Sequence, residues 1–299
     1  MKLHRERLRE GIWFFLMAGP ALLGFLFLVL GPMLYSFYLS FTSYNVVDPP
    51  RWVGAENYLY LIQDDPAFWP SVKVTLIYAG VQIPLSLMIA LGIALLLNNQ
   101  VKALGAFRTI FYLPSLLPAT ASVVIWIWIF HPNYGLLNEL LSKFGIAGPA
   151  WLNSTTWALP ALIIMTLWSF GGAMIVFLAG LQGVPRGLYE AASIDGANAW
   201  HRFRHVTLPI LSPVIFFNLV MGVIGAMKVF DQAYVFGAAM DKVPGGPARA
   251  TLFYVLHLFQ TAFNYFHMGL ASAMAWMLFA VIALLTWLNF RLGRKWVHH

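Results

Sequence analysis

The chain has 299 residues, of which 60% are hydrophobic and only 10% are charged. Soluble domains are about half apolar and about a quarter charged, so this composition excludes an ordinary soluble protein and indicates an integral membrane protein. The absence of cysteine excludes a disulfide framework and a thiolate metal site. The net charge of +7 is divided among short segments between apolar runs, which is typical of membrane orientation rather than nucleic-acid binding.

Six apolar segments are predicted to cross the membrane as helices, which gives an all-α integral membrane fold. The first is longer than the ~7–15 apolar residues of a signal peptide, so we expect it to be retained. Each segment is close to the ~20 residues that cross a ~30 Å hydrocarbon core. The expected spans are about 12–39, 72–97, 109–130, 158–181, 210–230 and 268–290, within a membrane domain of 12–291 that is flanked by 1–11 and 292–299.

Lysine and arginine predict the orientation of these spans. Of the 18 such residues, twelve lie in the N-terminal segment, the 98–108 loop, the 182–209 loop and the C-terminal tail. Five lie in or beside the opposite segments: Arg51, Lys73, Lys143, Lys242 and Arg249. The remaining one, Lys228, lies within a span. The positive-inside rule therefore predicts that both termini and the 184–209 loop are cytoplasmic. The opposite segments 40–71, 131–157 and 231–267 are expected to cap the bundle or receive an external partner.

Motifs for bound cofactors are missing from the sequence. It contains no G-x-x-x-x-G-K-[ST] and no H-E-x-x-H, so ATP and a metalloprotease-type zinc ion are not expected in this chain. His201 and His205 are four residues apart, but no third ligand stands in a convincing position, so a metal site is not expected. His257 and His267 lie near span ends, where packing is expected rather than catalysis. We expect no cofactor in the chain and no nucleic-acid partner.

Polar residues inside the apolar segments are few. Lys228 and Asp231 are three residues apart and would share a helix face, either as an ion pair near the interface or as functional groups. Asn218 lies deeper, where its amide must hydrogen-bond a neighbouring helix or a polar solute. A stripe at helical spacing holds one amide, one thioether and two glycines, which leaves room for a cavity wall: Asn218, Met221, Gly222 and Gly225.

The polar stretch 184–209 separates the fourth and fifth spans. Pro185 can begin a helix, because its missing N–H would have no partner there anyway. Asp195-Gly196 predicts a turn. A second short helix is expected from Asn198 to His205, with Pro209 and Pro213 ending it and starting the next segment. The pattern predicts a helix–turn–helix at the membrane surface.

The same stretch resembles a known family. Glu190-Ala191-Ala192, three residues, Gly196, nine residues and Val206-x-Leu208-Pro209 resemble the E-A-A-x3-G-x9-I-x-L-P loop of bacterial binding-protein-dependent ABC importer permeases, with valine for isoleucine. Other segments resemble the carbohydrate-uptake branch and its first permease subunit, of the maltose and glycerol-3-phosphate type: 128–138, 229–235, 244–251 and 267–275. The stretch after Tyr234 is longer than usual, which affects the expected shape of the 236–247 loop.

The resemblance implies an assembly in the bacterial inner membrane. Its other members would be a second permease subunit, two ATP-binding cassette subunits that bind ATP, and an extracytoplasmic solute-binding protein. The helix bearing Glu190 would dock in a cleft of the ATPase. The implied coupling residues are Glu190, Ala191, Ala192, Asp195, Gly196, Leu208 and Pro209. The implied contacts with a sugar-like solute are Ser169, Phe170, Ala173, Asn218, Met221, Gly222 and Gly225, with Phe170 and Asn218 foremost.

Three other kinds of protein fit parts of the sequence. A self-sufficient channel or secondary transporter would carry solute without an ATPase, but the sequence shows no inverted repeat. An intramembrane enzyme would need paired catalytic groups, for which Lys228 and Asp231 are the candidate. A purely structural subunit would tolerate replacement of Asn218 and Phe170.

Overall fold

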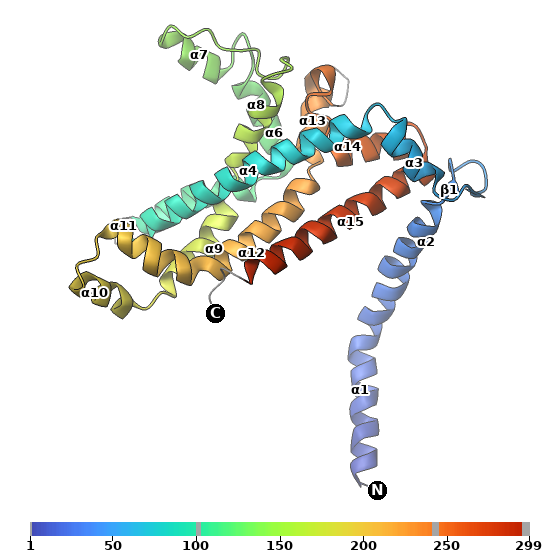
Figure 1. Cartoon of the computed structure of the whole chain (residues 1–299), viewed down its shortest axis with the longest axis horizontal. Helices are drawn as coiled ribbons and strands as arrows, with labels where there is room; N and C mark the ends of the chain where they lie inside the picture. The colour runs from blue at the N-terminus through green and yellow to red at the C-terminus, as the bar shows by residue number, and fades with distance from the viewer. Residues whose placement is uncertain (1, 100–102, 241–244, 295–299) are drawn as a thin grey trace. The chain divides into compact units, whose positions relative to one another are not determined.

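The computed structural model describes residues 2–99, 103–240 and 245–294, with only the backbone described for 2–12 and 238–240. Part of the expected tail (295–299) and part of the 236–247 loop (241–244) therefore lie outside the described residues. The described chain is mainly helical and contains one two-stranded ribbon (Figure 1). It forms two compact units: Met1–Asp64 with Leu258–Met277, and Asp65–His257 with Leu278–His299.

The first unit begins with a long apolar helix. It comprises α1 (Lys2–Gly24), the π-helical turn η1 (Phe25–Leu30) and α2 (Gly31–Leu39). An antiparallel ribbon of β1 (Thr42–Ser43) and β2 (Arg51–Trp52) follows, then α3 (Glu56–Gln63), and later the π-helical turn η5 (Gln260–Asn264). In this unit Gly269 lies so close to the Thr42 carbonyl that no side chain would fit.

The second unit holds most of the helices. Their bounds are α4 (Phe68–Leu97), α5 (Leu104–Tyr112), η2 (Leu113–Leu116), α6 (Ala119–Ile129), α7 (Leu136–Lys143), α8 (Ala158–Leu167), α9 (Gly171–Gln182), α10 (Arg186–Ile194), α11 (Ala199–Arg202), η3 (Phe203–Thr207), α12 (Leu208–Met227), α13 (Asp231–Met240) and η4 (Pro247–Arg249). Two helices run from one unit into the other: α14 (Tyr254–Phe259) and α15 (Met268–Gly293).

Helix α4 is the centre of the second unit. It packs against α8, α9 and α12, and α13 packs against α6. One buried apolar cluster joins α4, α6, α8 and α13 through residues such as Tyr78, Phe130, Leu162 and Phe236. A second joins α4, α9 and α12 through Phe177 and neighbours. Because lipid tails are as apolar as these side chains, van der Waals packing between the helices, rather than the hydrophobic effect, is what such clusters contribute within a membrane.

Among the described residues, four helices are long and apolar enough to cross a membrane: Trp13–Leu39, Phe68–Leu97, Ala199–Gly237 and Met268–Gly293. Two further pairs pass the same test only together: Leu104–Leu116 with Ala119–Ile129, bent by 99°, and Ala158–Leu167 with Gly171–Gln182, bent by 44°. The expected third and fourth spans, 109–130 and 158–181, are therefore not single straight helices. Pro118 explains the first bend, because it forces Leu117 into an extended conformation (ψ 136°).

Two expectations about the fifth span are wrong. Pro209 does not separate a short helix from the span, because α11, η3 and α12 form one unbroken helical run from Ala199 to Met227. Pro209 lies within this run, directly after the π-helical turn η3, and such local π turns re-satisfy the backbone groups that a proline frees. Lys228 and Asp231 do not share a helix face, because α12 ends at Met227 and α13 begins at Asp231.

Candidate functional site

Three helix interruptions meet at one cavity of about 340 Å³ in the second unit. Leu117 lies at the break before α6, Ser169 at the break between α8 and α9, and Val229 at the break between α12 and α13, and all three line the cavity. Broken helices leave backbone N–H and C=O groups without intrahelical partners. In a membrane protein such backbone is tolerated where it is buried in protein or lines a polar cavity. The breaks therefore mark the cavity as a candidate solute site.

The cavity wall is polar but carries no charged side chain. Its polar members are Tyr78, Gln82, Ser122, Thr166, Ser169 and Gln232, and its remaining members are Leu117, Ala119, Met165, Gly222, Gly225, Ala226 and Val229. Tyr78 has a side-chain hydrogen bond with Thr166. Within the described chain, the amides of Gln82 and Gln232 have no hydrogen-bond partner. Amides and hydroxyls around a volume in the ~300–1,000 Å³ range of small-molecule sites suit a hydroxylated, uncharged solute.

The structure brings only part of the expected solute-contact set to this cavity. Ser169, Gly222 and Gly225 line it. Phe170 and Ala173 instead pack against the second apolar cluster. Asn218 is buried and its Nδ2 donates to the Val214 carbonyl at 3.0 Å, so its own helix satisfies the amide. Met221 is 53% exposed and does not line the cavity.

Sequence reasoning missed the cavity residues on α4 and α6 and at the start of α13. These are Tyr78, Gln82, Ser122 and Gln232, together with Thr166 on α8. Gln82 carried a usable signal, because a polar amide within an apolar run is costly in lipid unless it serves a purpose. Tyr78 and Ser122 gave no such signal, because both residue types are common in buried helices.

A second feature is the hairpin formed by α10, α11 and η3, called here the 184–209 hairpin. α10 ends in a Schellman motif: the N–H of Ala197 donates to the Ala192 carbonyl (2.9 Å) and that of Gly196 to the Ser193 carbonyl (3.1 Å). Gly196 adopts φ +77°, the left-handed conformation that glycine tolerates best. The predicted helix beginning after Pro185 and the turn at Asp195-Gly196 are confirmed.

Polar contacts join the two limbs of the hairpin. The Tyr189 hydroxyl lies 2.9 Å from Thr207 Oγ1, and Arg202 Nη1 donates to Ser193 Oγ at 2.9 Å. The side chain of Asn198 caps α11 by accepting the His201 N–H at 2.8 Å. These contacts give the hairpin a defined shape around a concave space of about 440 Å³.

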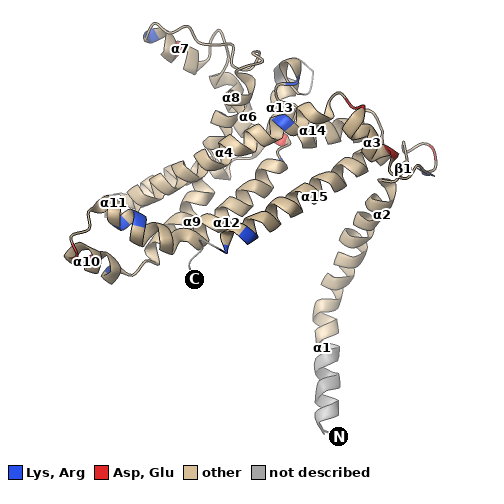
Figure 2. Cartoon of the chain, viewed as in Figure 1, with Lys and Arg blue, Asp and Glu red and all other residues tan. Residues whose placement is uncertain are grey.

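The outer surface of the hairpin exposes apolar and charged residues together. α10 has no buried residue, and Glu190 is exposed on it. Leu188 is 45% exposed, Ile194 87% and Trp200 64%, on a segment too polar to lie in lipid. Exposed apolar side chains within a charged surface are typical of a protein interface. Figure 2 marks basic residues in blue at α11 and at the C-terminal end of α15.

The remaining residues that the sequence singled out lie in or next to the hairpin and at the end of α12. Ala191, Ala192, Asp195 and Gly196 belong to the last turn of α10 and its C-terminal cap, while Leu208 and Pro209 begin α12. His201 and His205 stack at 4.4 Å between ring centroids, and no described group of three His, Asp or Glu side chains could hold a metal. Lys228 and Asp231 are both exposed, and among the described residues they form no ion pair with each other.

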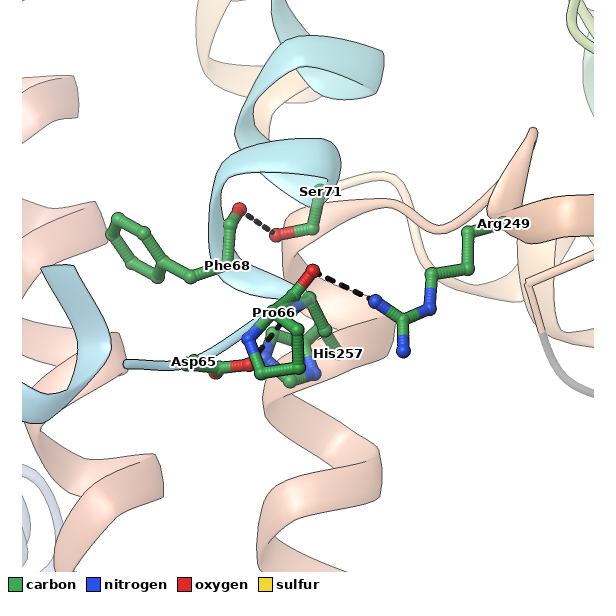
Figure 3. Close-up of polar contacts among 7 residues, drawn as sticks. Asp65, Pro66, Phe68, Ser71, Arg249 and His257 are labelled. Atoms are coloured by element: carbon green, nitrogen blue, oxygen red, sulfur yellow. Dashed lines mark hydrogen bonds and ion pairs between the residues drawn. The ribbon is translucent and has the colours of Figure 1, made fainter. Parts of the chain in front are cut away.

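A buried polar cluster lies where α4 begins (Figure 3). His257 Nε2 and Asp65 Oδ2 are 2.7 Å apart, and both side chains are less than a tenth exposed. Asp65 Oδ1 also accepts the Ala67 N–H at 2.8 Å, and Arg249 Nη1 donates to the Pro66 carbonyl at 2.7 Å. Burial raises the pKa of Tyr254, and the nearby Asp65 carboxylate raises it further. The cluster fastens the 245–257 segment to α4, so His257 has the packing role expected of it.

Taken together, these features define a polytopic membrane protein with a polar cavity among broken helices and an exposed hairpin. The chain belongs to the family of inner membrane components of binding-protein-dependent transport systems, whose model matches residues 68–298. It is thus a transport permease of the ABC importer kind, as the resemblance implied, and not an enzyme family member.

Particular relatives cover almost the whole chain. It is 44% identical over 301 residues to the probable ABC transporter permease protein YesP of Bacillus subtilis strain 168, covering all of this chain and 96% of that protein. It is 34% identical to the trehalose/maltose transport system permease protein MalF of Thermococcus litoralis, covering 96% and 95%. The fold matches a chain of the bacterial alginate ABC transporter, crystallised with an alginate pentasaccharide-bound periplasmic protein, at TM-score 0.80, 21% identity and 97% and 96% coverage.

Proposed function

We propose that the chain forms half of the translocation pathway of an ATP-driven importer for a sugar or sugar-like solute. The observation that carries this proposal is the cavity of about 340 Å³, where three helix breaks, amides and hydroxyls meet without a charged side chain. Such a surface suits a solute with many hydroxyl groups, which each amide can both donate to and accept from. Relatives named for trehalose/maltose and lactose transport support the same solute class.

The partners in this proposal are a second permease subunit, two ATP-binding cassette subunits and an extracytoplasmic solute-binding protein. The apolar window of the first span, within Trp13–Leu39, has none of its residues buried inside the chain, as expected for a helix that faces lipid or another subunit. The periplasmic protein named with the alginate transporter supports the binding-protein partner. ATP is bound and hydrolysed by the partner subunits, because the sequence contains no P-loop.

The proposed topology has six spans in a bacterial inner membrane, with each bent pair counted as one span and both termini in the cytoplasm. Basic residues support this orientation. Arg186, Arg202 and Arg204 lie in the hairpin, and Arg291 and Arg294 lie at the end of α15 (Figure 2). Lysine and arginine are enriched on the cytoplasmic side of membrane proteins. The hairpin is then in the compartment that holds ATP.

Coupling is proposed to pass through the 184–209 hairpin. α10 would dock on an ATPase subunit, with Glu190 paired to a basic group there and Leu188 and Ile194 in apolar contact. Replacing an exposed carboxylate at such an interface by a cation turns attraction into repulsion. Glu190→Lys is therefore expected to lower uptake while the chain still folds, and normal uptake by this variant would contradict the docking role.

The experiment that tests the function uses proteoliposomes offered radiolabelled maltose, trehalose and lactose. Vesicles with the chain, its partner permease, ATPase subunits and binding protein are expected to accumulate one or more of these sugars only when ATP is present. Vesicles with the chain alone are expected to take up none. Sugar flux through the chain alone would instead establish a self-sufficient transporter or channel. Failure of all three sugars with the complete set would contradict the solute class.

Two cavity amides give that experiment a matched pair of variants. Gln82→Leu and Gln232→Leu keep similar volume but remove hydrogen-bonding capacity, and each is expected to lower uptake by about tenfold if it bonds the solute. Phe217→Leu is the control, because Phe217 is 53% exposed and does not line the cavity. If uptake were unchanged in both glutamine variants, the cavity would not be part of the solute pathway.

A further inference from the structure

The contact between Tyr189 and Thr207 joins α10 to the helical run that continues into α12. Tyr189 is in the middle of α10, and Thr207 is the last residue of the π-helical turn η3. Their hydroxyl oxygens are 2.9 Å apart, and Thr207 is only 4% exposed. Thr207 Oγ1 also donates to the Arg202 carbonyl at 3.4 Å, so the Tyr189 hydroxyl is the donor to Thr207. The phenol therefore reaches from one limb of the hairpin into the base of the other.

Thr207 belongs to the same unbroken helical run as the cavity wall. The run extends from Ala199 to Met227, and Gly222 and Gly225 on it line the cavity. At 1.5 Å per residue, Gly225 is roughly 27 Å from Thr207 along the helix. When Thr207 is displaced, the part of the helix that lines the cavity is therefore displaced with it, because a packed helix moves as a rigid element.

Few other contacts tie α10 to this run. No residue of α10 is buried, so packing does not hold it in place. The Arg202–Ser193 hydrogen bond is exposed, where water competes with it. The remaining link to the run is the backbone turn at residues 195–198, about which α10 can pivot as far as its connection to α9 at residues 183–185 allows. The part-buried Tyr189–Thr207 bond is the contact that opposes such a pivot.

We infer that Tyr189 and Thr207 are positioning residues that clamp α10 to the cavity-lining helix, so that motion of the ATPase reaches the cavity. The inference rests on the proposed function, in which α10 docks on an ATPase subunit. It assigns a specific task to two residues outside the E-A-A-x3-G pattern. With the clamp, force on α10 moves α12; without it, α10 rotates about its turn.

The clamp itself is tested on the full chain alone, in lipid nanodiscs. The chain has no cysteine, so Gly187→Cys on α10 and Phe217→Cys on α12 can carry a pair of spin labels. A Cβ at Gly187 meets no atom within 4 Å, and Phe217 is 53% exposed, so both labels are accommodated. Loss of one hydrogen bond is expected to raise the fraction of detached hairpins roughly two- to tenfold, seen as a broader distance distribution.

Four variants separate the hydroxyl contact from general packing. Tyr189→Phe and Thr207→Val each remove one hydroxyl and keep the shape, so both are expected to broaden the distribution. Thr207→Ser keeps the hydroxyl and is expected to retain the narrow one. The double variant Tyr189→Phe/Thr207→Val is expected to be no broader than either single variant, because they share one bond. A distribution as narrow in Tyr189→Phe as in the parent chain would overturn the clamp.

A second measurement tests transmission in the complex with the partner permease and ATPase subunits. Gly225→Cys places a thiol in the cavity, and its rate of reaction with a maleimide is followed with and without Mg-ATP. The ATP-dependent change in rate is expected to fall roughly two- to tenfold in Tyr189→Phe, while ATP hydrolysis and the melting temperature of the complex persist. A full ATP response in this variant would overturn the inference. No ATP response in the parent complex would contradict the proposed function, and the nanodisc measurement would still decide the clamp.

Discussion

Gly196 shows how a single residue sets the shape of the hairpin. Its φ of +77° ends α10 and turns the chain toward α11, and a Cβ there would meet no atom within 4 Å. Space for a side chain is therefore available, and glycine is needed here only because of its positive φ. An L side chain in the left-handed region costs about 1 kcal/mol or more.

Gly196→Ala is expected to make the hairpin open about fivefold more often, because about 1 kcal/mol corresponds to that ratio. Hydrogen–deuterium exchange over residues 186–205 measures it as faster exchange. Gly187→Ala is the matched control: Gly187 is helical, a Cβ there also meets nothing, and alanine favours helix. Equal exchange in both variants would show that the turn is not needed.

Asp65 is expected to stabilise the fold because its carboxylate is the partner of the buried His257 imidazole. In Asp65→Ala, the buried His257 side chain loses the carboxylate at 2.7 Å, and the Ala67 N–H loses its acceptor. Leaving such groups unsatisfied costs about 1–3 kcal/mol. The measurement is the thermal unfolding of the purified chain in detergent. Asp64→Ala, at the neighbouring exposed aspartate, should leave the unfolding temperature unchanged; an equal loss there would implicate general charge instead of the cluster.

At the scale of the helices, glycine determines how closely two helix backbones can approach each other. A Cβ at Gly171 would lie 2.8 Å from the Phe111 carbonyl oxygen and 2.9 Å from the Tyr112 Cα, so α9 begins directly against α5. Its neighbour Gly172 has no atom within 4 Å of the same position. The two glycines are adjacent in sequence but differ completely in surroundings.

Gly171→Ala is expected to push α9 away from α5 and to destabilise the chain by about 1–3 kcal/mol, the usual cost of overpacking. Gly172→Ala is expected to be neutral or stabilising by about 0.5–1 kcal/mol, because glycine inside a helix is unfavourable. Thermal unfolding in detergent compares them. A higher unfolding temperature for Gly171→Ala than for Gly172→Ala would show that the two backbones do not need to touch.

Hydropathy predicts where the apolar helices lie but not how they break. The span at 268–290 and that at 72–97 agree with α15 and α4 to within a few residues, because length and apolarity are local properties. The break at Leu117 has a local cause in Pro118, which a hydropathy profile does not register. The break at Ser169 depends on which neighbour offers partners to the freed backbone groups, and only the tertiary structure determines this. The helical run through Pro209 shows the opposite case, where a proline causes no break because it directly follows the π-helical turn η3.

The same contrast holds for the sites. The hairpin was predictable because its turn, cap and spacing are all local in sequence. The residue pattern predicted Gly222 and Gly225, which share a face of one helix, and the family resemblance implied Ser169. Tyr78, Ser122 and Gln232 come from three other helices and were not predicted. Asn218 shows that an amide in an apolar segment can bond its own helix, here the Val214 carbonyl, as well as a solute.

At the scale of the whole molecule, orientation follows from the distribution of charge, and the absence of cysteine makes it directly measurable. Phe144, just after α7, is 79% exposed and belongs to a segment expected outside the cell membrane. Gly187 belongs to the hairpin expected in the cytoplasm, beside Arg186. A thiol at each position would therefore report on opposite sides of the membrane.

In spheroplasts treated with a membrane-impermeant maleimide, Phe144→Cys is expected to label at once and Gly187→Cys only after the membrane is permeabilised. The physical reason is the cost of moving arginine-rich segments across the membrane, which the hairpin and the end of α15 would both incur in the reverse orientation. The cysteine-free parent gives the background. The reverse labelling pattern would place the hairpin outside, away from ATP, and would contradict both the coupling role of α10 and the clamp formed by Tyr189 and Thr207.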